Sequence, residues 1–289
     1  MAAADLSVEE LSDVAVSKLG ELLAPIQAFT VLNPGDGRVK NTGGGTGGKY
    51  EVEVTNAVPA TGDNVANYES GLTSGSQSNV AVTTANIAVQ QKLTNLQASA
   101  GIPFKTRVPD AAKGLAAGLW DKVTAMINGG GFTDAGQAAS ASALTVAEIQ
   151  TLRAAVPAND VTLMVEHSTS AALYPSDKNS FQFSEVGAYG YNNIYPVSNF
   201  DGGVTKQMAF ACSKEAAVVV AGKALESQDS IDLSSGNFIL EDFTIESVGV
   251  PVQMRIHQNT ATRDIYLILE TTFGIAAVDA SAGAWLDHA

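Results

Sequence analysis

Residues 33 to 79 restrict the possible folds of this chain more than any other segment, because they contain little that could form a core. The segment is rich in Gly, Thr, Ser and Asn, and its apolar residues are scattered. Structureless connections beyond about 15 residues are uncommon inside compact domains, and this one is roughly three times that length. Either the segment is disordered, or it is an extended arm that becomes ordered against another copy of the chain. The second alternative predicts a protein that assembles.

Composition narrows the class of protein. The 289 residues allow two domains, or one domain with insertions. Charged residues make up only 16% of the chain, against about 25% in an ordinary soluble domain. We therefore expect a surface covered by small polar residues or by neighbouring subunits. The net charge of −14 argues against a protein that grips nucleic acid through a basic surface.

Targeting and disulfide signals are absent from the sequence. Cys212 is the single cysteine, which excludes an internal disulfide and a thiolate metal cluster. No basic residue precedes Lys18 and no apolar core of a signal peptide follows. No stretch reaches the roughly 20 apolar residues of a membrane span. We expect a protein made and kept in a cytoplasm, with no membrane partner.

The first predicted element is a helix from Ser7 to Pro25. Ser7 and Glu10 fit a capping box, and Pro25 marks the end of the helix. Apolar residues recur at helical spacing between them, at Leu11, Val14, Ala15, Leu19, Leu22 and Leu23. This apolar stripe needs a partner that the neighbouring sequence does not supply.

The long polar segment contains a predicted hairpin. Lys49 to Val54 alternate as a strand, and Val80 to Val89 form a return strand rich in β-branched residues. An isolated hairpin is marginally stable at best. We therefore expect this hairpin to need a surface outside itself.

A strong helix follows, opened by Pro109 and Asp110 and stopped by the glycines at 129–131. Gly114 and Gly118 lie one turn apart inside it, and each costs about 1 kcal/mol relative to Ala. Close packing of another element along this face would compensate that cost.

Short α/β elements are predicted for residues 133 to 240, and strands for the C-terminal third. Thr145 and Glu148 predict a capped helix through Ala155, and short strands are expected at 161–165, 193–197 and 208–212. Alternation at 248–257 and again at 265–269 predicts a long two-stranded ribbon. Pro251 lacks an N–H for the ladder, which suggests an edge strand. A final strand is expected at 273–278.

One motif has the spacing of a phosphate-binding loop. Gly43 to Lys49 fits the pattern G-x-x-x-x-G-K. Tyr50 stands where that loop has Ser or Thr, however, and the next residues read as a strand rather than a helix. The histidines at 167, 257 and 288 have no metal-ligand spacing. We therefore expect no enzyme activity, no cofactor and no metal site.

The order of these elements resembles the major capsid proteins of tailed bacteriophages with the HK97-like fold. The resemblance is carried by residues 144–175, by the stretch NIYPVSNF at 193–200, and by residues 208–225 and 248–278. It implies an α+β fold with an N-terminal arm, an extended β-hairpin loop, a spine helix with a long β-ribbon, and an apical α/β domain. The implied division is an arm at 1–32, an extended loop at 33–92, a peripheral domain at 93–132 and 241–274, and an apical domain at 133–240 and 275–289.

The same resemblance implies a major capsid protein. Its copies would form pentamers and hexamers of an icosahedral shell, part of a virion assembled in the host cytoplasm. The shell would enclose double-stranded DNA without sequence-specific binding, with scaffold, portal and decoration proteins as further partners. The alternative is an encapsulin-like nanocompartment, which shares the fold and encloses cargo protein. The expected subunit-interface residues are Leu11, Leu19, Leu22, Tyr50, Val52, Val54, Tyr68 and Leu72.

Overall fold

The computed structural model describes residues 8–43, 48–55, 77–100, 104–138, 144–166, 189–197, 207–223 and 238–287. Its helices are α1 (Val8–Leu23), α2 (Asn95–Ser99), α3 (Arg107–Gly129) and α4 (Val146–Ala155), with 3-10 turns η1 (Ala24–Ala28), η2 (Phe104–Thr106) and η6 (Ala280–Ala282). The strands are β1 (Thr30–Leu32), β2 (Val39–Asn41), β3 (Lys49–Thr55), β4 (Gln77–Thr83), β5 (Ala85–Leu93), β6 (Thr133–Gln137), β7 (Thr162–Glu166), β8 (Asn193–Val197), β9 (Gln207–Cys212), β10 (Ala217–Gly222), β11 (Phe238–Ile245), β12 (Val250–Gln258), β13 (Ile265–Ala277) and β14 (Gly283–Asp287).

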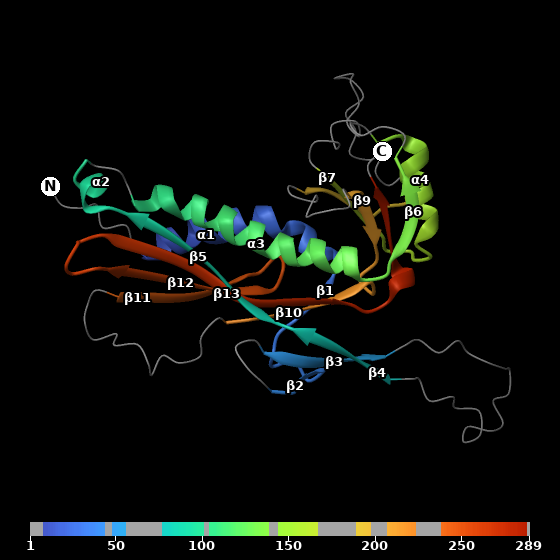
Figure 1. Ribbon diagram of the computed structural model, residues 1–289, viewed down its shortest axis with the longest axis horizontal. Helices are drawn as coiled ribbons and strands as arrows, with labels where there is room; N and C mark the ends of the chain where they lie inside the picture. The colour runs from blue at the N-terminus through green and yellow to red at the C-terminus, as the bar shows by residue number, and fades with distance from the viewer. Residues whose placement is uncertain are drawn as a thin grey trace.

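The largest sheet has six strands in the order β1-β10-β13-β12-β11, with β5 added along β13. Only the β1–β10 pair is parallel. Helices α1 and α3 lie along one face of this sheet (Figure 1). The alternation of β12 and β13 places Met254 and Leu269 opposite each other, and both side chains are buried beneath the helices. Each such side chain contributes about 1.5–3 kcal/mol when fully buried.

The glycines of α3 allow close packing, as predicted. A Cβ on Gly114 would lie 3.0 Å from Cγ1 of Val89, and a Cβ on Gly118 would lie 2.9 Å from Cγ2 of Ile87. Both partners belong to β5, so the glycine face of the helix is the face on which β5 packs. The helix ends where the sequence predicts, with Gly131 in the left-handed region at φ 69°, a conformation that favours glycine.

A second sheet of five strands has the order β6-β14-β9-β7-β8. Helix α4 lies beside it (Figure 1), and the predicted capping box is present, with the backbone N–H of Glu148 donating to Oγ1 of Thr145. The hydroxyl of Tyr191 donates to the carbonyl of Ile149 at 2.7 Å, which joins α4 to the loop before β8. Its elements all lie within the ranges expected for the apical domain, 133–240 and 275–289.

A third sheet contains β2, β3 and β4 and lies on the opposite side of the large sheet from α1 and α3 (Figure 1). The predicted hairpin is confirmed in its described part, where Tyr50 pairs with Val82 and Thr55 with Gln77. The return strand is divided at Thr84, so that β4 pairs with β3 whereas β5 pairs with β13.

Two strands pair outside the parts of the chain to which the expected division assigns them. β5 lies within the range expected for the extended loop, yet it pairs with β13 over nine residues. β10 lies within the expected apical range, yet it is central in the large sheet, between β1 and β13. All six β10 residues are buried, so both faces of this strand must be covered by other parts of the chain.

Two further expectations for the C-terminal strands were wrong. β12 is not an edge strand, because β11 pairs along its other side and places Pro251 opposite Thr244. β13 pairs with β12 only from Gln253 onward, so Pro251 interrupts no β12–β13 hydrogen bond. The strand expected at 273–278 is the continuation of β13, which pairs first with β12 and then with β10. The ribbon is therefore part of a wider sheet.

Candidate functional site

The three-stranded sheet is anchored on its own chain by a small apolar cluster. Val52 of β3 is 2% exposed and Val82 of β4 is 1% exposed. The cluster consists of Leu32, Val39, Val52, Val82, Val218 and Val220. It joins the base of the hairpin to β1 and β10 of the large sheet. The base of the hairpin is therefore ordered without a second copy.

A tight crossing fixes the direction in which the hairpin leaves the body. The backbone N–H and the hydroxyl of Thr84 both donate to the carbonyl of Gly48, at 2.9 and 3.1 Å. β13 passes under this point, and a Cβ on Gly274 would lie 2.6 Å from the carbonyl oxygen of Thr83. Because this neighbour is backbone, only glycine fits at position 274 without moving the strands.

The structure describes six of the eight expected interface residues, in two different environments. Leu11 is 4% exposed, Leu19 is 0% exposed and Val52 is 2% exposed, and their own chain covers all three. The apolar stripe of α1 packs on α3 and the large sheet of the same molecule, and Val52 packs on β1 and β10. Sequence reasoning missed this partner because α3 lies about a hundred residues further along the chain.

The remaining expected residues stay predictions. Leu22, Tyr50 and Val54 are half-buried, each packed on one side against its own chain. Tyr68 and Leu72 lie outside the described residues. The three half-buried side chains retain apolar surface on the outside of the molecule, at the end of α1 and along β3. They are the described part of the expected contact surface.

The hairpin has two chemically different faces. The residues Tyr50, Val52 and Val54 share one face, which meets the body near the base of the hairpin. The other face carries Glu51 and Glu53, and Asn79 donates to Glu51 at 3.5 Å. An amphipathic hairpin of this kind can lie with its apolar side on a protein surface and its acidic side toward solvent.

A chain of polar contacts crosses three strands, β13, β12 and β11, on the face of the large sheet turned away from α1 and α3. Arg255 forms an ion pair with Glu270 and donates to Oε1 of Gln253 at 3.1 Å. The amide of Gln253 donates to Asp242 at 2.8 Å, and Lys223 pairs with Asp242 at 2.7 Å. Burial opposes ionisation of Asp242, but these hydrogen bonds outweigh it and lower the pKa of its carboxyl group.

This polar chain ties the strands together rather than forming a reactive site. Glu270 is 4% exposed and Gln253 is 2% exposed. Removing the partner of such a buried group would therefore be costly in free energy. The alternation at 248–257 puts Gln253 and Arg255 on one face of the strand, but it does not show that Gln253 is buried and Arg255 half-buried. The signal was Glu270 within the apolar run of β13, because a carboxylate at such a position requires a partner.

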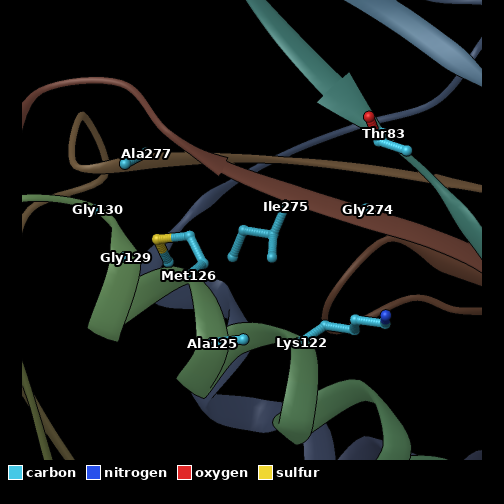
Figure 2. A pocket seen from close by; sticks show the side chains of 9 residues that line it. All are labelled: Thr83, Lys122, Ala125, Met126, Gly129, Gly130, Gly274, Ile275 and Ala277. Carbon is cyan, nitrogen blue, oxygen red and sulfur yellow. The ribbon is translucent and has the colours of Figure 1, made fainter.

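A hollow of about 380 Å³ lies between the end of α3, β13 and the end of β4 (Figure 2). Its lining is Thr83, Lys122, Ala125, Met126, Gly129, Gly130, Gly274, Ile275 and Ala277. Lys122 is the ionisable residue of this lining and no carboxylate, histidine or cysteine accompanies it. The hollow therefore lacks the paired groups of acid–base or nucleophilic catalysis.

The motifs considered for chemistry have structural roles where the structure describes them. Lys49 opens β3, and its carbonyl accepts from the backbone N–H of Thr42 at 2.9 Å, so the glycine run joins antiparallel strands instead of preceding a helix. His257 stacks on Tyr266, with ring centroids 4.9 Å apart. Burial raises the pKa of the Cys212 thiol, which makes it a poor nucleophile.

No group of three or more His, Cys, Asp or Glu side chains is placed to hold a metal ion among the described residues. Within the same residues, no helix combines the length and apolar character needed to cross a membrane.

The fold is similar to that of solved shell proteins. A virus-like particle protein from Pyrococcus furiosus superimposes with a TM-score of 0.57 and 11% identity, over 96% of this chain and 98% of that chain. The chain has the HK97-like fold. A structure from Gordonia phage Cozz gives a TM-score of 0.51 and 11% identity, over 93% of this chain and 87% of that chain. No family model and no curated protein matches the sequence.

The described residues form three sheets: the large sheet carries α1 and α3, the five-stranded sheet lies beside α4, and β3 with β4 forms the base of the hairpin (Figure 1). The expected α+β architecture is confirmed.

Proposed function

We propose that the protein is a major capsid protein whose copies assemble into a closed icosahedral shell around double-stranded DNA. The observation that carries the proposal is the similarity in fold over nearly the full length of a virus-like particle protein. The low content of charged residues, 16%, and the amphipathic hairpin also support it, because both favour surfaces that other subunits cover.

The contact surface that we propose combines the extended loop with the end of α1. Leu22, Tyr50 and Val54 retain exposed apolar area, and Tyr68 and Leu72 would extend the surface beyond the hairpin base. A stable pairwise contact needs about 1,600 Å² of buried surface. Ordering a loop costs about 1–2 kcal/mol per residue, so contacts with neighbouring subunits must offset that cost.

Electron microscopy of the purified chain tests shell formation. Negative staining should show uniform closed particles of pentamers and hexamers. A sample that stays monomeric at high protein concentration, over a range of salt and pH, would contradict the proposal. Scaffold, portal and decoration proteins remain proposed partners, and the virion assembled in a host cytoplasm remains the proposed location.

The contents of native particles distinguish the proposal from its alternative. Shells purified from the producing cells and treated with nuclease should retain double-stranded DNA, which the shell protects without sequence preference. An encapsulin-like nanocompartment would instead retain a cargo protein and no protected DNA. The genes beside the coding sequence give an independent check, because a virion requires portal and terminase genes.

A further inference from the structure

Three large apolar side chains are markedly exposed among the described residues. They are Leu96 at 81%, Val146 at 50% and Ile239 at 40%. Single exposed apolar residues are ordinary, but Leu96 and Ile239 lie at the same end of the large sheet. Leu96 belongs to α2, which lies at the end where β12 turns into β13 (Figure 1). Ile239 lies near the start of β11, whose first residue pairs with His257 at that same end.

Leu96 is held in a fixed position although nothing in the described chain covers it. Thr94 and Gln97 form a capping box around α2, and the backbone N–H of Asn95 donates to Asp264 at 3.0 Å. None of the five residues of α2 is buried. A helix this short is not stable alone, so these contacts hold α2 in place and fix the position of the exposed Leu96 side chain.

Ile239 lies on the opposite edge of the sheet from α2. At this end the strand order is β5-β13-β12-β11, so three strand spacings of about 4.8 Å separate the two edges. No described strand pairs with the outer edge of β11. The eight residues of β11 contain neither proline nor glycine, and an open edge of this length is normally covered.

Charges beside the two apolar residues are complementary. Lys105 of η2 is exposed and lies two residues before Arg107, which donates to Gln97 of α2 at 3.3 Å. Glu241 follows Ile239 by two residues and therefore shares its face of β11. Within the described residues, neither the side chain of Lys105 nor that of Glu241 has an ion pair or hydrogen bond.

We propose that α2 of one copy docks on the β11 edge of a second copy, with Leu96 against Ile239 and Lys105 against Glu241. The two patches are different and lie on opposite edges of one chain, so the contact is heterologous and can close into a ring. The inference rests on the proposed function for its partner, a second copy, and adds a contact that the extended loop does not make.

Disulfide trapping tests the contact directly. Leu96→Cys and Ile239→Cys chains are mixed and treated with a mild oxidant. The mixture should give a disulfide-linked dimer, whereas each variant alone should stay largely unlinked. Cys212 is buried and should not react. Val146→Cys is the matched control, because Val146 is exposed on α4 of the other sheet, and its mixture with Leu96→Cys should give no dimer.

Charge reversal provides the second test. Lys105→Glu and Glu241→Lys should each cause loss of assembly, measured by light scattering, while the unfolding midpoint of the subunit stays unchanged. The chain that carries both changes should assemble again, because the pair is restored with its signs exchanged. Unimpaired assembly of both single variants would overturn the assignment of these two residues.

The outcomes separate the contact from the proposed function. Trapped dimers with closed shells support both. If the dimer is trapped but the protein forms only open or irregular oligomers, the contact is supported and the shell is contradicted. Closed shells without the Leu96→Cys/Ile239→Cys dimer overturn the contact and leave the shell standing. Neither dimers nor shells would overturn both.

Discussion

Gly118 sets the distance between α3 and β5. Ala is favoured over Gly in a helix by about 1 kcal/mol, but a Cβ at this position would lie 2.9 Å from Cγ2 of Ile87, a β-branched side chain with little rotamer freedom. We expect Gly118→Ala to lower the free energy of unfolding by about 1–2 kcal/mol in net terms. Urea unfolding of the isolated subunit measures the change.

Gly129 provides the control for this prediction. It lies in the same helix, and a Cβ there would meet nothing within 4 Å. Gly129→Ala should therefore be neutral or stabilising. Adding Ile87→Ala to Gly118→Ala should remove the clash, so that the two changes cost less together than their sum. If both glycine replacements stabilised the protein equally, β5 would be able to move away from α3 without loss of stability.

Asp264 is expected to make the attachment of α2 sensitive to acid. Hydrogen bonds from Lys92 and from the backbone of Asn95 lower the pKa of its carboxyl group. A carboxylate with a lowered folded pKa stabilises the fold above its ordinary value of about 3.9, and this contribution is lost as the pH falls through the folded value. Asp264→Asn should therefore be less stable than the wild type at neutral pH, and the two should converge in acid.

Urea midpoints measured from neutral pH into the acid range check this convergence. Asp121→Asn is the matched control, because it removes one exposed carboxylate of α3 and leaves Asp264 in place. A gap between Asp264→Asn and the wild type that stays constant across the range would mean that the carboxylate charge is irrelevant.

Among the elements, α4 depends most clearly on a local signal. Thr145 accepts a hydrogen bond from the backbone of Glu148, whose side chain accepts from the backbone of Thr145 in return. We expect Thr145→Ala to cost about 1 kcal/mol of stability. Thr151→Ala in the same helix is the control, since its hydroxyl only donates back to Ala147. Urea unfolding, monitored by circular dichroism, compares the stability of the two variants. An equal loss of stability in both would contradict the expected contribution of the cap.

The elements also show which predictions from sequence succeed. The capping box of α4, the glycine stop of α3 and the alternation of β12 are confirmed, because each depends on residues within a few positions of one another. The edge assignment of Pro251 was wrong, because it required knowledge of β11, which pairs on the far side. The apolar residues of β10 indicate a buried strand but not which sheet it joins, since an apolar strand fits any buried position.

At the scale of the whole molecule, the extended loop is expected to be needed for assembly and not for folding. Thr55 pairs with Gln77 at the described end of the hairpin, so an Asn-Gly turn can replace residues 56–76 and close the same register. The free energy of unfolding of the shortened chain should stay within about 0.5 kcal/mol of the wild-type value. It should form no shells in negative stain.

A milder variant separates loop length from side-chain contact. Tyr68→Ser with Leu72→Ser keeps the length of the loop and removes the two expected contact residues. This variant should fold normally and should assemble more slowly or at higher protein concentration, as light scattering would show. Shells that form at wild-type rates from both variants would contradict the loop surface.

Short-range patterns determined α1, α3 and α4, most strands, the hairpin and the order of elements that resembles the HK97-like fold. These features arise from spacing, caps and breakers that act within one or two turns of chain. Tertiary structure alone decided that α1 packs on α3, that β5 and β10 join the large sheet, and that Leu11, Leu19 and Val52 are covered by their own chain. The reason is physical: an apolar stripe specifies burial but not its partner, and the partner is selected only when distant segments compete for the same surface.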